Sequence, residues 1–135
     1  TEKSDDKSIE LVSSMARHLG AARLAVNTPE EHDSIIAYTS DLMHISASAL
    51  CLDFNENMNL AYTAGAFRDC TRIAMINPKL WTELFLENAE HIVTEIDRFS
   101  ASLNKFRDAI ANGRADRLFD ILSTVRANKT DILKR

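Results

Sequence analysis

Apolar residues recur every three or four positions along most of the chain, which is the spacing of one face of an α-helix. The first such stretch follows Ser4, which we expect to be the N-cap, and ends at Gly20, a residue typical of the position after a helix. Its apolar face carries Ile9, Val12, Met15 and Leu19. Residues 22–27 place Leu24 and Val26 in alternation instead, which predicts one short strand that needs a partner strand from elsewhere.

A second helix is predicted from Thr28 to about Leu52. Thr28 is a good N-cap, Pro29 suits the first helical position, and Glu31 completes a capping box with Thr28. The middle of this helix is rich in small and polar residues, which allow another helix to approach closely. The polar residues 53–59 are expected to form the turn that follows.

The stretch from Tyr62 to Trp81 is the centre of the chain's organisation. It places Gly65 in a turn before a short amphipathic helix that carries Arg68, Asp69 and Arg72 and ends at Asn77-Pro78. An arginine held on a helix is suited to anchor a carboxylate or a phosphate, because its planar guanidinium bonds two oxygens at once. The alternatives are a solvated arginine or an ion pair between Arg72 and Asp69, which lie within one helical turn of each other.

From Pro78 to Ala111 no residue interrupts the helical pattern, and we expect one helix about 50 Å long. Its apolar residues follow a heptad spacing: Phe85, Ala89, Ile92, Ile96, Phe99, Leu103, Phe106 and Ile110. Such a helix is longer than a compact monomer of this size, so the seam predicts a homodimer. After Asn112-Gly113 a last helix, residues 115–133, is expected to turn Leu118, Leu122 and Val125 inward. The predicted fold class is therefore mainly all-α, a helical bundle of long helices with one short N-terminal strand.

Composition narrows the classes of function. The chain has 135 residues, of which 45% are hydrophobic and 27% charged, and this favours a globular domain over a disordered one. A formal net charge of −4 without a basic cluster argues against nucleic acid and anionic membranes as partners. No apolar run is expected to reach the length of a membrane span. Two cysteines, Cys51 and Cys70, without metal-binding spacing predict a reducing, cytoplasmic location.

Three further groups of residues carry side chains that are common in functional sites. Ser40, Asp41 and His44 share a helix, where their nearly parallel side chains and the lack of a glycine-rich oxyanion loop argue against a hydrolase triad. Ser40 and His44 suit either a polar cleft lining or a helix-packing pair. The run 31–33 lacks metal-binding spacing and predicts a solvated first turn, and Trp81 is more typical of a core than of a ligand contact. No GxGxxG or GxxxxGK[ST] motif is present to hold a nucleotide phosphate.

Taken in order, four blocks of residues resemble the prephenate dehydrogenase family of tyrosine biosynthesis. They are Pro29-Glu30-Glu31-His32-Asp33; Ser40-x-x-x-His44 with Ala47 and Ala49-Leu50; Ala64-Gly65-Ala66-Phe67-Arg68-Asp69-x-Thr71-Arg72-Ile73-Ala74; and Pro78-x-x-Trp81-x-x-x-Phe85-x-x-Asn88. The resemblance covers the C-terminal half of the family's protein. It implies the helical domain of prephenate/6-phosphogluconate-type dehydrogenases (residues 29–135), preceded by the last helix and edge strand of a dinucleotide-binding domain (residues 1–28).

The resemblance also implies roles for individual residues. Arg72 matches the arginine that binds a substrate carboxylate, His44 and Ser40 match polar positions of the same cleft, Gly65 matches a backbone turn near the ligand, and Trp81 matches an aromatic position beside it. The catalytic residues and the NAD or NADP site belong to the absent N-terminal domain. The fragment alone is therefore expected to be inactive, to bind neither cofactor nor metal, and to supply the dimer interface and half of the prephenate cleft.

The chain departs from the family's usual sequence at several positions. Asp41 and Met43 replace the histidine and proline of a Ser-His-Leu-Pro-His run, Ala66 replaces a second glycine, and Cys70 replaces a phenylalanine. These changes leave open prephenate against arogenate as substrate, and whether tyrosine inhibits by binding here. A different class of function, a non-catalytic helical dimerisation or interaction module, also fits the heptad helix, and a helix-turn-helix regulator is opposed by the acidic charge.

Overall fold

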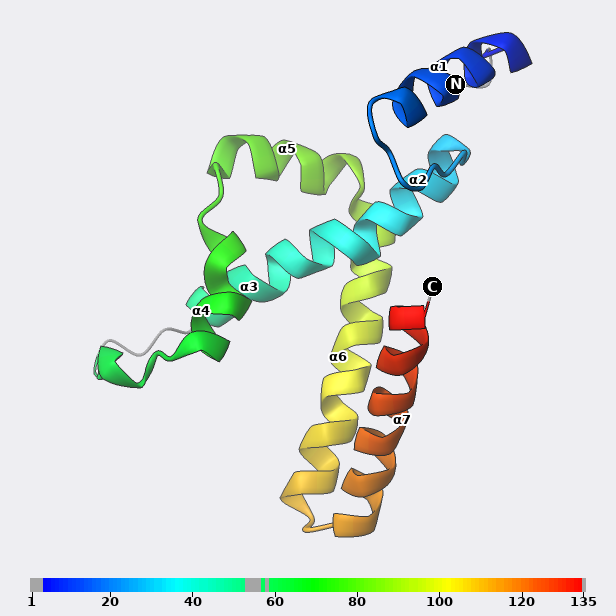
Figure 1. Cartoon of the computed structure of the whole chain (residues 1–135). Coiled ribbons are helices and arrows are strands. Elements are labelled where there is room, and N and C mark those ends of the chain that lie inside the picture. Colours follow the sequence, from blue (N-terminus) through cyan, green and yellow to red (C-terminus); the bar gives the residue numbers. More distant parts are fainter. Residues whose placement is uncertain (1–3, 53–56, 58, 135) are drawn as a thin grey trace. The chain divides into compact units, whose positions relative to one another are not determined.

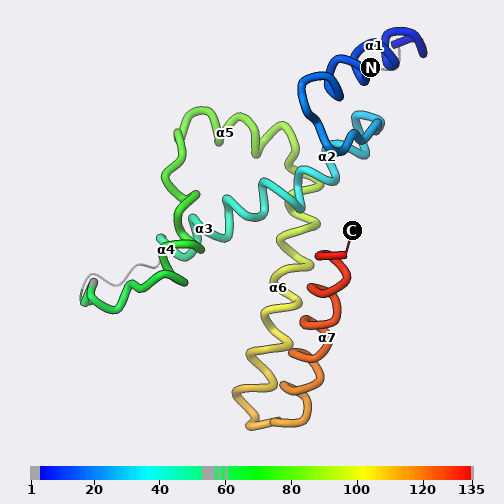
Figure 2. Tube along the Cα trace, in the orientation of Figure 1, coloured from blue at the N-terminus to red at the C-terminus, as the bar shows by residue number. Residues whose placement is uncertain are grey.

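The computed structural model describes residues 4–52, 57 and 59–134, and every regular element in them is helical (Figures 1 and 2). In chain order these are α1 (Asp6–His18), α2 (Pro29–Ile36), the π-helical η1 (Ala37–Asp41), α3 (Leu42–Leu52), the 3-10 turn η2 (Leu60–Tyr62), α4 (Gly65–Thr71), the 3-10 turn η3 (Arg72–Ala74), α5 (Pro78–Glu87), α6 (Ala89–Ala111) and α7 (Ala115–Lys134). The all-α prediction is confirmed. The chain divides into two compact units, Thr1–Ile92 and Val93–Arg135.

The predicted strand at residues 22–27 is wrong, because the described part of the chain has no strand there. A strand is stable only when its backbone N–H and C=O groups bond to a neighbouring strand, and the described residues supply none. Helix α1 before this segment is capped by Asp5 and not by Ser4, since the Ser8 N–H donates to Asp5 Oδ1 over 2.8 Å. Gly20 takes a left-handed φ of 95° after that helix, as predicted for a C-terminal glycine.

The start of α2 confirms the predicted capping box. The Glu31 N–H donates to Thr28 Oγ1 over 3.2 Å, and the Thr28 N–H donates to Glu31 Oε2 over 2.8 Å. The helix then continues through η1 and α3 to Leu52, but its middle is a π turn in which the Leu42 N–H donates to the Ala37 carbonyl. A π turn inserts one extra residue, which rotates the side chains that follow by about 100° around the helix.

Length and composition alone would let the helix Pro29–Leu52 cross a membrane, since its most apolar window has a mean hydropathy of 1.3. The sequence-based expectation that no apolar run is long enough therefore needs correction. Core helices of soluble proteins can be equally long and apolar. Asp41 lies near the middle of the helix and is 5% exposed, with a hydrogen bond from Asn88, a placement that favours packing within the protein over contact with lipid.

The prediction of one unbroken helix from Pro78 to Ala111 is wrong. Asn88 leaves the helical conformation, with φ −111° and ψ 26°, and separates α5 from α6. Its side-chain amide bonds to the Asp33 carbonyl and to Asp41, and these long-range contacts favour the break over a continuous helix. Helix α6 has 23 residues, about 35 Å, so helix length no longer argues for a dimer.

The second unit contains most of α6 and all of α7, which lie side by side as a helical hairpin (Figure 1). Asn112-Gly113 forms the turn between them, with Gly113 at a φ of 60°. Ala109 is buried in this hairpin and Leu118 is half-buried, whereas Leu122 and Val125, which were also predicted to point inward, remain about half exposed. The hairpin leaves a set of large apolar side chains uncovered: Val93, Phe99, Leu103, Ile110, Phe119, Leu122 and Val125.

Candidate functional site

His44 is the centre of one group of site residues in the first unit. Its Nδ1 lies 3.0 Å from the Ile73 carbonyl, and because a carbonyl only accepts, Nδ1 carries the proton and donates. The imidazole also packs on Trp81, with ring centroids 3.9 Å apart and planes tilted by 42°. Trp81 in turn contacts Phe85 with ring centroids 5.2 Å apart. The contacts of His44 and Trp81, two of the predicted site residues, thus join α3, η3 and α5.

Arg72 and Gly65 form a second group. Both line a cavity of about 490 Å³ whose other lining residues are Arg68, Asp69, Thr71 and Met75. Arg72 is exposed and starts η3, the same short turn whose Ile73 carbonyl accepts the hydrogen bond from His44. The His44 imidazole therefore tethers the turn that presents the Arg72 guanidinium.

The ion-pair and ligand interpretations of Arg72 make different geometric predictions. An ion pair with Asp69 was one alternative to a ligand contact, and the two residues do line the same cavity. Within the part of the chain that the structure describes, however, none of the ion pairs involves Arg72 or Asp69. This argues against the ion pair and agrees both with a solvated arginine and with one that binds a ligand.

Gly65 does not form a special turn. It is the first residue of α4, its φ is not in the left-handed region, and a Cβ built on it would meet no atom within 4 Å. Backbone conformation and packing in this chain therefore do not require glycine. The open space beside Gly65 lies at the wall of the Arg72 cavity, where a ligand could approach the backbone.

Ser40 lies in the π turn one helical turn before His44 and is half-buried. The described residues contain no hydrogen bond between Ser40 and His44, and His44 Nδ1 is engaged by the Ile73 carbonyl. Asp41 Oδ2 accepts from Asn88 and not from His44. These contacts agree with the prediction that the three residues are not a hydrolase triad.

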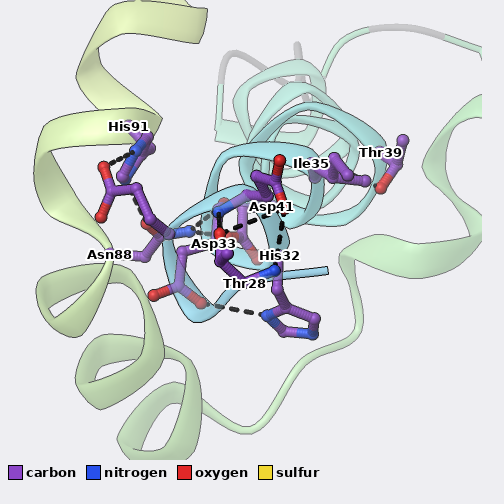
Figure 3. Close-up of polar contacts among 10 residues, drawn as sticks. Thr28, His32, Asp33, Ile35, Thr39, Asp41, Asn88 and His91 are labelled. Carbon is purple, nitrogen blue, oxygen red and sulfur yellow. Dashed lines mark hydrogen bonds and ion pairs between the residues drawn. The ribbon is translucent and has the colours of Figure 1, made fainter. Parts of the chain in front are cut away.

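Sequence reasoning missed a polar network at the junction of α5 and α6 (Figure 3). Asn88, His91, Asp41 and Glu30 are linked through their side chains. The available signal was a buried acid, Asp41, in the middle of an apolar helix, because such a group needs a hydrogen-bond partner.

At residues 31–33, Glu31 acts as a capping residue and His32 contacts Asp33 over 3.0 Å. The described residues include no group of three metal-binding side chains.

Comparison with known proteins defines first the class of protein: the chain has the fold of the helical domain of a dehydrogenase. It superimposes on prephenate dehydrogenase from Aquifex aeolicus, solved with hydroxyphenyl propionate and NAD+, with a TM-score of 0.82 and 31% identity over 98% of this chain and 48% of that one. Synechocystis arogenate dehydrogenase has the same fold, with a TM-score of 0.79 and 22% identity over 98% of this chain and 50% of that one.

The family model described as "Prephenate dehydrogenase, dimerization domain" matches residues 28–124, so the chain belongs to the prephenate dehydrogenase family. Cyclohexadienyl dehydrogenase of Zymomonas mobilis is 38% identical over 104 residues, which are 73% of this chain and 36% of that protein. Prephenate dehydrogenase of Bacillus subtilis is 28% identical over 130 residues, 93% of this chain and 35% of that protein. The chain thus spans about a third of the length of these curated relatives.

Proposed function

We propose that this chain is the C-terminal helical part of an NAD(P)-dependent prephenate dehydrogenase, and that it supplies the dimer interface and half of the substrate cleft. The observation that carries the proposal is the exposed Arg72 guanidinium, which lines a cavity and has no ion-pair partner among the described residues. Family membership gives this cation a role, since prephenate carries two carboxylates and a guanidinium binds a carboxylate through two parallel hydrogen bonds.

The other site residues fit a role in binding around that anchor. Because His44 donates from Nδ1 to Ile73, its Nε2 is the nitrogen left for a polar group of the ligand. Trp81 packs against the His44 ring at a tilt and contributes an aromatic wall. Gly65 leaves room for close approach at the cavity wall, and Ser40 is a polar group on the same helix as His44. None of these residues is assigned a catalytic step; they bind and orient the substrate.

The reaction itself, oxidative decarboxylation of prephenate to 4-hydroxyphenylpyruvate, requires a nicotinamide that accepts the hydride. The residues of this chain do not fit a nucleotide site, because Gly20, Gly65 and Gly113 are too far apart to form GxGxxG. We place that site in a dinucleotide-binding domain whose last elements are residues 1–28. Three facts support this boundary: the family match begins at residue 28, the chain spans only part of its relatives, and α1 exposes Leu11, Val12 and Met15. We also place the enzyme in the cytoplasm, because a reducing environment suits its two free cysteines, Cys51 and Cys70.

The 135-residue chain alone is predicted not to bind NAD+ or NADP+, because it lacks the glycine fingerprint that lets a helix N-terminus approach a pyrophosphate. Isothermal titration calorimetry of the purified chain with each nucleotide should give only the heat of dilution. Saturable binding in the micromolar range would show that the nucleotide site has been placed in the wrong part of the protein.

Arogenate is the second candidate substrate, because relatives of this chain include enzymes named for arogenate and for cyclohexadienyl substrates in general. The test of the proposed function is a spectrophotometric assay of NAD(P)+ reduction by the enzyme that contains this chain, with prephenate and arogenate supplied in parallel. Reduction with prephenate supports the proposal. A non-catalytic dimerisation module would give no reduction with either compound.

A further inference from the structure

Asn88 contacts the helix Pro29–Leu52 at two points (Figure 3). Its Nδ2 donates to the Asp33 carbonyl over 2.9 Å and to Asp41 Oδ2 over 3.2 Å. Both partners only accept hydrogen bonds, so the side-chain nitrogen of Asn88 faces Asp33 and Asp41 and its side-chain oxygen faces away from them. Asn88 Oδ1 then accepts from His91 Nδ1 over 3.1 Å, and His91 Nε2 lies 3.1 Å from Glu30 Oε1. Every polar atom of the Asn88 side chain is therefore engaged.

The contact with Asp41 lies inside the π turn. Asp41 is the last residue of η1 and is 5% exposed, so leaving its carboxyl without a donor would be costly. The π turn determines the direction of the side chains that follow it, and His44 is the third residue after Asp41. A hydrogen bond that holds Asp41 in the π turn would therefore also set the direction in which the His44 side chain leaves the helix.

Helix α5 is thus joined to the helix Pro29–Leu52 near each of its ends. Trp81, in its first turn, packs on His44, and Asn88, its C-cap residue, bonds to Asp41 and Asp33. Trp81 and Asn88 are seven positions apart, about two helical turns, and both side chains contact the helix Pro29–Leu52, so they lie on the same side of α5. One side chain of α5 contacts a predicted site residue and the other fixes the turn that orients it.

We propose that Asn88 is a positioning residue for the substrate site: its hydrogen bond to the buried Asp41 holds the π turn in the register that places His44 between Trp81 and the Ile73 carbonyl. Through that carbonyl it also fixes the turn that begins with Arg72. Asn88 touches neither the cavity lining nor the proposed ligand contacts. The kinetic part of the proposal rests on the proposed function, and the structural part does not.

The test compares two substitutions. Asn88→Asp replaces an amide by a carboxylate, and Asp41→Asn replaces a carboxylate by an amide. Asn88→Asp keeps the size of the residue but directs a carboxylate at Asp41 and at the Asp33 carbonyl. Asp41→Asn keeps an oxygen that accepts from Asn88. We expect Asn88→Asp to lower kcat/KM for the ring substrate by about tenfold or more, mainly through KM, because His44 and Arg72 are displaced from the ligand. Asp41→Asn should stay within about twofold of wild type.

A second readout does not depend on activity. Trp81 is the single tryptophan of the 135-residue chain, so its fluorescence reports the His44 contact directly. Asn88→Asp should shift the emission to longer wavelength and raise its quenching by acrylamide, whereas Asp41→Asn should match wild type. The double variant Asp41→Asn with Asn88→Asp restores a hydrogen bond between the two positions in the reverse direction. It should regain part of the wild-type emission and part of the lost kcat/KM.

The outcomes separate positioning from a general structural role. If Asn88→Asp leaves Trp81 emission and KM unchanged, Asn88 only caps a helix and the proposal is overturned. If Asn88→Asp does not fold, the double variant is still expected to fold and to show wild-type-like emission; its failure to do so also overturns the proposal. An enzyme that oxidises neither prephenate nor arogenate would contradict the proposed function while leaving the fluorescence result to test the role of Asn88.

Discussion

Arg72→Ala in the complete enzyme is expected to lower kcat/KM for prephenate by about ten- to a hundredfold or somewhat more. The guanidinium lines the cavity and has no ion-pair partner among the described residues, so its removal takes away a ligand contact without unpairing a buried acid. A hydrogen bond to a charged group contributes about 1.5–3 kcal/mol, and each 1.4 kcal/mol is about a factor of ten. Most of the loss should appear in KM, because a carboxylate remote from the reacting ring carbon is bound equally in the ground and transition states.

Two comparisons make this result specific to the guanidinium. Arg72→Lys should recover only part of the lost kcat/KM, because an ammonium is a point charge and cannot form two parallel bonds to a carboxylate. Arg107→Ala, which removes an exposed arginine from the second unit, should leave the kinetics unchanged. Thermal unfolding of Arg72→Ala should match wild type, since the side chain is exposed. Unchanged kinetics would mean that Arg72 does not bind the substrate, and a variant that fails to fold would mean that Arg72 has a structural partner instead.

Phe99→Asp is expected to convert a homodimer into a monomer. Within the second unit the hairpin of α6 and α7 leaves large apolar side chains uncovered, among them Phe99 at 38% and Leu103 at 53% exposure. The family model that matches residues 28–124 is described as a dimerization domain. Burying one phenylalanine side chain contributes about 1.5–3 kcal/mol, and a two-fold interface contains each residue twice. Losing both copies and burying two carboxylates should weaken association by at least a hundredfold.

The matched control for this substitution is Asn104→Asp, which adds the same charge to the same helix. Asn104 is exposed and lies five residues after Phe99, about 140° around the helix, and so points away from the apolar seam. Light scattering after size-exclusion chromatography should give twice the chain mass of 15.1 kDa for wild type and for Asn104→Asp, and the chain mass for Phe99→Asp at the same micromolar concentration. A wild-type chain that elutes as a monomer would refute the homodimer.

Local signals in the sequence predicted most of the helix boundaries. The capping box at Thr28 and the glycines at positions 20 and 113 act within a few residues, so their effects can be recognised without tertiary structure. The break at Asn88 could not be predicted in this way. Asparagine is only a moderately poor helix former, and the contacts that favour the break are 47 and 55 residues away. The predicted strand failed for the converse reason, because alternation alone cannot supply a partner strand.

The candidate site was predictable only where its residues are close in sequence. Gly65 and Arg72 belong to one motif and line one cavity. Ser40, His44 and Trp81 entered the prediction through the family resemblance, and the spacing of residues alone did not distinguish a cleft lining from core packing. The π turn at Ala37–Asp41 adds a single residue to a long helix, which changes the apolar periodicity too little to be detected. Asn88, which bonds to this turn, belongs to one of the blocks that resemble the family, but no role could be predicted for it from the sequence.

The central claim, that this chain belongs to a working prephenate dehydrogenase and provides its substrate anchor, is tested most directly by one assay. The enzyme that contains this chain is supplied with prephenate and NAD+ or NADP+, and reduced nucleotide is followed together with 4-hydroxyphenylpyruvate. We expect the two products in equal amounts, with the rate at low prephenate lowered by the Arg72→Ala substitution. The absence of reduced nucleotide with prephenate and arogenate alike, from a folded dimer that retains its dinucleotide-binding domain, would contradict the claim.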